Sequence, residues 1–238
     1  MKRILTLVAV CVLGGSVTLG AQRGAPPAPA NARQGAPIDL TGYWVSVVTE
    51  DWKFRMVTPN KGEFGGLPLN AEGQKVGKTW DPARDEAAGE QCRAYGAPAI
   101  MRIPGRLHVT WQDDNTLKVD TDAGTQTRLL RFGAAVAPAE PSWQGHSVAQ
   151  WNRPGLSLKV LTNNLRMGYV RKNGAPYSDK TVVTEYFDVN TMPNGDQVLT
   201  VTTKVEDAVY FTRPFLTSSD FKKLPDATGW SPSPCSAR

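Results

Sequence analysis

Between residues 107 and 129 apolar and polar side chains alternate with a period of two. The alternation is interrupted at Asp113-Asp114-Asn115 and at Asp122-Ala123-Gly124, two segments with the composition of tight turns. Three runs remain, residues 107–112, 117–121 and 125–129. Strict alternation bounded by turn residues predicts half-buried antiparallel β-strands.

Similar short runs, separated by turn signals such as Asn173-Gly174, predict further strands. Their expected ranges are 41–49, 147–151, 156–162, 181–187, 198–205 and 209–216. A helix is expected over residues 69–80 with Asn70 as its cap, and a short turn of helix after Asp81, whereas residues 84–95 are expected to form a loop. An antiparallel meander of this length closes into a barrel or a sandwich, because closure removes unpaired edges. The predicted fold class is all-β.

The two ends of the predicted β domain differ in composition from its centre. Residues 1–21 have a positive start, an apolar run over residues 4–13 and small residues at the end, which predicts a cleaved signal peptide and a periplasmic or secreted protein. Residues 22–37 contain Ala, Pro, Gly, Gln, Arg and one Asn without a large apolar side chain until Ile38, which predicts a disordered linker. A single domain is then expected over residues 38–238.

The charge pattern argues against a nucleic-acid partner. Loss of Lys2 and Arg3 with the signal lowers the net charge from +5 to +3. No Lys/Arg run exceeds two residues, whereas nucleic-acid surfaces need clustered basic residues. The apolar run 4–13 is too short to span a membrane.

The cysteines and histidines limit the cofactor chemistry. Cys92 and Cys235 remain after export, and two thiols in an oxidising compartment predict one disulfide, although two free thiols are an alternative. Closing so long a loop stabilises the fold by about 4–5 kcal/mol in the chain-entropy model. With two histidines and no paired thiols, no metal site is expected, and without phosphate or dinucleotide motifs no cofactor is expected.

Turn lengths set the expected register of the first three strands. A three-residue loop with Asn115 in the left-handed region places His108 opposite Asp120. A three-residue loop with Gly124 in that region places Asp120 opposite Gln126, with Arg128 on the diagonal. His108, Asp120 and Arg128 would then share one face. Either this row points to solvent, or it lines a barrel interior where Asp120 orients His108 or Arg128 toward a ligand.

Three further positions are candidates for chemistry. Glu185 lies in mid-strand and is either a surface carboxylate or a buried acid–base group. His146 is either a structural histidine or a second proton-transfer group. Tyr177 belongs to a polar loop that either rims an opening or only forms the turn. Four tryptophans are candidate walls of a ligand site or core residues: Trp44, Trp111, Trp143 and Trp151.

From Cys92 onward the chain resembles a family of exported bacterial proteins that is abundant in acidobacteria and related soil lineages. The shared motifs are Gly96-x-Pro98, Trp143-x-Gly145-His146-Ser147 followed by Trp151, Gly174-x-Pro176-x-Ser178-Asp179, Glu185-x-Phe187 and Asp207-x-x-Tyr210-x-x-Pro214. Many relatives have a histidine where this chain has Tyr177. The resemblance covers over half of the chain and implies a related fold without implying an activity.

A second resemblance concerns residues 39–44. Their sequence Asp-Leu-Thr-Gly-Tyr-Trp is similar to the Gly-x-Trp first strand of lipocalin-like barrels. Together with export, a meander and one disulfide, this similarity implies a lipocalin-like barrel.

Three functional hypotheses follow. The first is an exported β-barrel that binds a small, largely apolar molecule at its mouth, with the tryptophans as walls. The polar contacts would come from His108, Asp120, Arg128, Tyr177 and Glu185. The second is a cofactor-free enzyme, an isomerase, cyclase or hydrolase, that uses Glu185, His146 or Asp120 for proton transfer. The third is an envelope interaction protein without a pocket.

Overall fold

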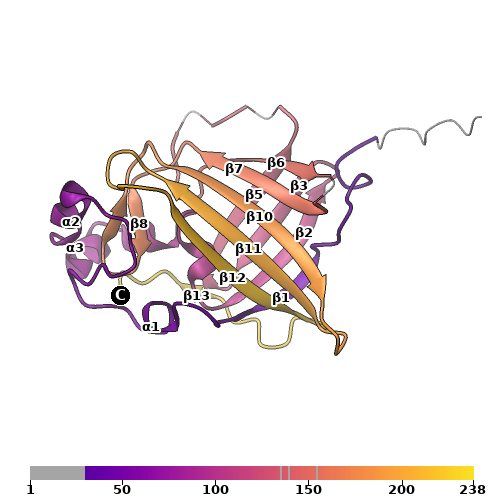
Figure 1. Ribbon diagram of the computed structural model, residues 1–238, viewed down its shortest axis with the longest axis horizontal. Coiled ribbons are helices and arrows are strands. Elements are labelled where there is room, and N and C mark those ends of the chain that lie inside the picture. The colour runs from indigo at the N-terminus through magenta and orange to yellow at the C-terminus, as the bar shows by residue number, and fades with distance from the viewer. Residues whose placement is uncertain (1–29, 135, 139, 154) are drawn as a thin grey trace, which may run out of the picture.

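Nine strands close into a barrel in the computed structural model, which describes residues 30–134, 136–138, 140–153 and 155–238 (Figure 1). In sequence order they are β1 (Gly42–Val47), β2 (Arg106–Asp113), β3 (Thr116–Thr121), β5 (Gln126–Phe132), β6 (His146–Asn152), β7 (Ser157–Asn163), β10 (Val182–Thr191), β11 (Gln197–Glu206) and β12 (Phe215–Leu224). The order around the barrel is β1-β12-β11-β10-β7-β6-β5-β3-β2, and β1 closes it by pairing with both β12 and β2. The predicted all-β barrel is confirmed.

One pair of strands departs from the antiparallel meander. β5 and β6 run parallel, with Leu130 opposite Ser147 and Phe132 opposite Ala149. Parallel neighbours need a crossover connection, and residues 133–145 provide it. The other barrel pairs are antiparallel, so the meander holds on either side of this seam.

The barrel interior is filled by side chains that alternate along each strand. On β10, Phe187 belongs to one hydrophobic cluster and Val183 to a second one. The first cluster contains Trp44, Phe221 and Leu199, each with at most 1% of its surface exposed. These side chains meet along the barrel axis, so the interior is a packed core.

The register of the first hairpin is as predicted, but that of the second is not. His108 lies opposite Asp120, although Asn115 does not take the expected left-handed conformation. In the second hairpin Gly124 is left-handed as expected, at φ 78°, but Thr125 is left-handed as well, at φ 48°. The loop therefore has one more residue, and Asp120 lies opposite Thr127. A shift of one residue moves every following side chain to the opposite face, which brings Arg128 into the barrel.

The predicted position of the last barrel strand is wrong. The predicted strand 209–216 is mostly turn, and β12 (Phe215–Leu224) follows it. The inward positions of β12 include Thr217 and Ser219 between Phe215 and Phe221, which weakens the hydrophobic alternation.

Short helices gather at one end of the barrel, which we call the helical end (Figure 1). They are α1 (Trp52–Met56), α2 (Ala71–Gly77), α3 (Pro82–Ala87) and two 3-10 turns, η1 (Gln91–Tyr95) and η2 (Ile100–Arg102). Two small sheets accompany them: β4 (Ala123–Gly124) with β13 (Ser233–Pro234), and β8 (Gly168–Arg171) with β9 (Ala175–Tyr177). The predicted caps are confirmed, since Asn70 and Asp81 accept backbone N–H groups of α2 and α3. The predicted loop 84–95 is wrong, because α3 and η1 occupy most of it.

Within the described residues, no helix is long and apolar enough to cross a membrane. The predicted signal peptide lies outside those residues.

The end of the predicted linker is ordered. The backbone N–H of Arg33 donates to the carbonyl of Asp114 at 3.0 Å, and the Trp151 indole donates to the carbonyl of Ala32 at 2.8 Å. Residues 31–37 therefore pack against the barrel end opposite the helical end, which corrects the expectation of disorder for that part (Figure 1). Hydrogen bonds of the backbone replace the missing apolar side chains.

The predicted disulfide is confirmed. Cys92 and Cys235 are bonded, with a separation of 143 positions in sequence. The bond joins η1 to the C-terminal segment at β13.

Candidate functional site

The interior of the barrel contains one buried ion pair. Arg128 donates to both carboxylate oxygens of Glu185, at 3.0 and 2.6 Å, and to the Thr162 hydroxyl at 3.4 Å. The hydroxyls of Thr162 and Ser147 are 2.7 Å apart. Arg128 is 1% exposed and Glu185 0%. Of the two alternatives for Glu185 the buried one is observed, but both of its oxygens are held by Arg128, which favours a structural role over proton transfer.

His108 and Asp120 lie on the outer face of the barrel, away from Arg128. The His108 ring stacks on Tyr43 with 4.0 Å between ring centroids, and Trp230 packs edge-on against both. Asp120 accepts from Thr127 at 2.6 Å and pairs with Lys118 at 2.8 Å. The expectation that His108, Asp120 and Arg128 share one face is therefore wrong, because the second hairpin has a four-residue loop. The outward reading of His108 and Asp120 fits the structure.

The predicted tryptophans occupy three separate places. Trp44 is fully buried in the barrel core, where its indole donates to the Leu40 carbonyl at 2.9 Å. Trp111 and Trp151 pack around Phe132 near the ordered N-terminal segment, with ring centroids 5.8 and 5.2 Å from it. Trp143 lies under the guanidinium of Arg166 at 4.7 Å. The structure does not bring the four into one wall.

His146 and Tyr177 are both buried. His146 begins β6, opposite Asn163. The Tyr177 ring is completely enclosed, and its hydroxyl fits between Gly96 and Gly168, where an added Cβ would come within 2.3 and 2.6 Å of it. Burial raises the pKa of the Tyr177 hydroxyl well above its ordinary value. This placement favours a packing role for Tyr177 over the rim of an opening.

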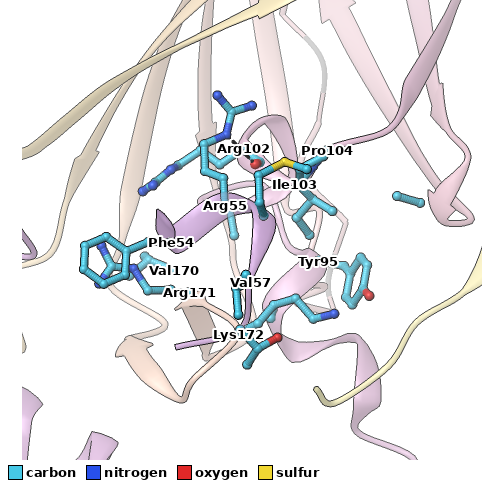
Figure 2. A pocket seen from close by; sticks show the side chains of 15 residues that line it. Phe54, Arg55, Val57, Tyr95, Arg102, Ile103, Pro104, Val170, Arg171 and Lys172 are labelled. Atoms are coloured by element: carbon cyan, nitrogen blue, oxygen red, sulfur yellow. Dashed lines mark hydrogen bonds between the residues drawn. The ribbon is translucent and has the colours of Figure 1, made fainter. Parts of the chain in front are cut away.

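A cavity of about 340 Å³ lies at the helical end, beside α1. Its walls come from four separate segments: residues 54–58, the η1–η2 region, Ala123 of β4, and residues 170–172 at the end of β8. Figure 2 shows the side chains of Arg55, Arg102 and Arg171 along one side, and Lys172 and Tyr95 along the other.

Three of these lining side chains are buried arginines, only 1 to 8% exposed. Arg55 pairs with Glu50 and donates from Nε to the Arg102 carbonyl at 2.8 Å. Arg102 and Arg171 share Asp51, which precedes α1. Asp51 has a left-handed backbone conformation, at φ 51°. The cluster thereby joins α1, η2 and β8.

Aromatic rings contact the cationic groups of this cluster. The Arg171 guanidinium lies 4.1 Å from the centroid of the Phe54 ring, and the Arg102 guanidinium lies 5.2 Å from that of Phe215. Lys172 Nζ is 5.3 Å from the centroid of Tyr95. Cations over ring faces are attracted by the ring quadrupole, so these contacts hold the charged groups in place.

The positive charge around the cavity exceeds the negative charge. Four cations, Arg55, Arg102, Arg171 and Lys172, face the two carboxylates of Glu50 and Asp51. Burial, together with the neighbouring charge of Arg102, lowers the pKa of Arg171 to about 10 against the attraction of Asp51 and Glu63. Burial also lowers the pKa of Arg102, although Asp51 counteracts this.

No pattern in the sequence predicts this cluster. Arg55, Arg102 and Arg171 are far apart in sequence and belong to no motif. The only local signal is an arginine next to apolar residues, as in Met101-Arg102-Ile103 and Val170-Arg171. Such a pattern also describes ordinary amphipathic surface segments, in which long cationic side chains cover apolar surface.

Motif residues that carry the family resemblance build the scaffold of the helical end. Gly96 packs against Tyr177, and its neighbour Ala97 donates its N–H to the Trp143 carbonyl at 2.9 Å. Asp207 accepts from the backbone of Ser178 and from the Thr181 hydroxyl. Burial raises the pKa of Asp207, but these hydrogen bonds and those from residues 209 and 210 outweigh it and hold the pKa below the ordinary value. The motifs therefore position the hairpin that carries Arg171.

Comparisons of this chain with protein-family models, with curated proteins and with solved structures found no match. The part of the chain that the structure describes contains no cluster of three or more His, Cys, Asp or Glu side chains able to hold a metal ion.

Proposed function

We propose that this protein binds a small molecule in the cavity at the helical end, rather than inside the barrel. The observation that carries the proposal is a cavity of about 340 Å³, partly open to solvent, between four segments of the chain and beside a barrel interior filled by its own side chains. Binding sites for small molecules are typically concavities of about 300–1,000 Å³ with apolar walls and a few polar groups.

The walls of the cavity fit a molecule with an apolar part. Tyr95, Ile103 and Val170 supply apolar surface, and Val57 is 65% exposed while also lining the cavity. An exposed apolar side chain beside a cavity is stabilised when a ligand covers it. The assignment of Trp44, Trp111, Trp143 and Trp151 as ligand walls is not part of this proposal, because none of the four lines the cavity.

The proposal places the protein outside the cytoplasm. The sequence of residues 1–21 supports export, and the Cys92–Cys235 disulfide is the kind of bond that persists in oxidising compartments. Membership of the exported bacterial family is proposed on its motifs.

Catalysis is less well supported than binding. Glu185 is held by Arg128, Asp120 lies on the outer face, and neither residue lines the cavity. A general acid or base must reach the proton that it transfers.

Native mass spectrometry of the exported protein from its host tests the proposal. The wild type is expected to retain a small molecule, and Thr58→Trp is expected to lose it, because Thr58 lines the cavity and an indole would occupy part of the space. The matched control is Thr228→Trp at an exposed position of the C-terminal segment, which should retain the molecule. Equal retention by all three proteins, or no retained molecule in the wild type, would contradict the proposal.

A further inference from the structure

We infer that the molecule bound in this cavity carries an anionic group, such as a carboxylate, a sulfonate or a phosphate, attached to an apolar body. The inference rests on the proposed function and specifies its ligand class. It depends on the basic cluster, which we define as Arg55, Arg102, Arg171 and Lys172.

The basic cluster carries more positive charge than its ion-pair partners balance. The basic cluster has four cations, and its ion-pair partners are the two carboxylates of Glu50 and Asp51. Glu63 is nearby but forms its own ion pair with Lys53 at 2.7 Å. Surplus charge next to a space with low-dielectric walls produces a strong local potential, which attracts ions of the opposite sign.

The three arginines of the basic cluster are incompletely hydrogen-bonded. Arg55 Nη2, Arg102 Nη1 and Arg171 Nε are buried and make no hydrogen bond to any of the described residues. Buried polar nitrogens without hydrogen bonds are costly. Arg128 Nε inside the barrel also lacks a hydrogen bond, but the basic cluster has three such nitrogens on neighbouring arginines, which indicates that the protein alone does not satisfy it. An anion in the adjoining cavity would supply the missing negative charge.

The burial of the arginines excludes a polymeric anion as the ligand. The arginine side chains are at most 8% exposed, so an extended phosphate backbone cannot reach them. Nucleic acids are bound through many exposed phosphate contacts. A small ligand can enter the cavity and place one anionic group beside the cluster.

Lys172 is the most adaptable member of the basic cluster. Its side chain is partly exposed, in contrast to the three arginines, and its ammonium lies against Tyr95. A flexible ammonium can move toward a bound anion with little rearrangement of the fold. Lys172 is therefore the position where the inference is tested with least risk to folding.

Two dyes with the same aromatic body provide the test. Anilinonaphthalene sulfonate carries one negative charge, and phenylnaphthylamine is the same body without the sulfonate. Titration of the purified full chain is expected to give at least about tenfold tighter binding of the sulfonate dye, since charge-assisted hydrogen bonds are about twice as strong as neutral ones.

Variants of the basic cluster localise the preference. Lys172→Met and Arg171→Met are each expected to weaken binding of the sulfonate dye about tenfold and to leave the neutral dye unchanged. Lys180→Met is the control, because it removes the same charge from a side chain that is 72% exposed outside the cavity. Lys172→Met keeps the test valid if Arg171→Met does not fold, as judged by thermal unfolding.

The outcomes separate this inference from the proposed function. If both dyes bind equally, are unaffected by Lys172→Met and are both lost in Thr58→Trp, the cavity binds neutral molecules and the inference is overturned while the proposed function stands. If neither dye binds, or if binding persists in Thr58→Trp, the cavity is not the site and both fail. A sulfonate preference that Lys180→Met reduces as much as Lys172→Met overturns the basic cluster as its cause.

Discussion

The protein buries arginines in two regions, and the two regions differ in how their charge is balanced. Inside the barrel, Arg128 faces Glu185 alone, with both carboxylate oxygens engaged. At the helical end, the basic cluster has twice as many cations as carboxylate partners and borders a cavity. The pair inside the barrel is balanced in charge and needs no further anion, whereas the proposed ligand would balance the surplus positive charge beside the cavity.

The position of Glu185 explains why the pair belongs to the fold. Along β10 it lies between Phe187 of the barrel cluster and Val183 of the cluster nearer the helical end. The pair therefore fills a layer between two apolar clusters. Carboxylates and guanidinium groups at such depth persist only when they are paired.

The largest expected effect concerns the covalent link that only the helical end has. Replacing Cys92 and Cys235 together with serine is expected to lower the free energy of unfolding by about 4–5 kcal/mol, since the chain then loses its long closed loop. The Tyr95 hydroxyl of the cavity wall accepts the backbone N–H of Ser236 in the C-terminal segment. The amide groups of this region should therefore lose their protection from hydrogen exchange first. Urea unfolding and hydrogen exchange measure the two effects. A double variant as stable as the wild type would contradict the prediction.

The second prediction concerns the ion pair between Arg128 and Glu185, which a substitution of Glu185 breaks. Glu185→Gln leaves Arg128 buried without a carboxylate and is expected to destabilise the protein by about 3–5 kcal/mol in urea unfolding. The combined variant Arg128→Met with Glu185→Leu removes both charges and should recover most of this loss, because two apolar side chains suit the packed interior. A loss of less than about 1 kcal/mol in the free energy of unfolding for Glu185→Gln would contradict the prediction, because it would show that water reaches the pair.

The third prediction concerns Asp207, whose carboxylate holds the hairpin that carries Arg171. Asp207→Asn is expected to cost about 1–3 kcal/mol at neutral pH, because Asp207 accepts from buried donors. The folded pKa of Asp207 lies below its unfolded value, so its contribution is present in full above about pH 5 and is lost as the pH falls below about 4. Unfolding of both proteins from pH 7 to pH 3 checks this: the difference should shrink on acidification, and a difference that grows contradicts it.

The smallest effect is expected where charge is in surplus. Arg171→Met loses the contacts with Asp51 and with the Gly65 carbonyl, but it also removes repulsion from Arg102. Because Asp51 is 35% exposed and keeps its ion pair with Arg102, we expect the free energy of unfolding to change by no more than about 1 kcal/mol. A loss as large as that of Glu185→Gln would mean that the two regions are balanced alike.

The fold could be predicted from the sequence where local patterns decide it. Alternation in residues 107–121 and turn residues fixed the first hairpin, and closure followed from the number of strands. The second hairpin failed because its loop length depends on Thr125 in a left-handed conformation, which threonine rarely adopts. β12 failed because Thr217 and Ser219 point inward next to the polar residues Ser218 and Asp220 along the strand, so the hydrophobic alternation is lost.

The candidate site could not be predicted in the same way. Its members lie on α1, η2 and β8, and only the packed helical end brings Arg55, Arg102 and Arg171 together. No periodicity records a contact between residues more than forty positions apart in sequence. The motifs of the family resemblance indicated the region, since Gly96 and Asp207 build it, but they did not indicate its charge.

A crystal structure of the protein soaked with anilinonaphthalene sulfonate tests the central claim most directly. The account predicts density for the dye in the cavity at the helical end, with its sulfonate next to Lys172 or an arginine of the basic cluster and the barrel core unchanged. Density for the dye inside the barrel, or only at the rings of Trp111 and Trp151 at the opposite end, would contradict it.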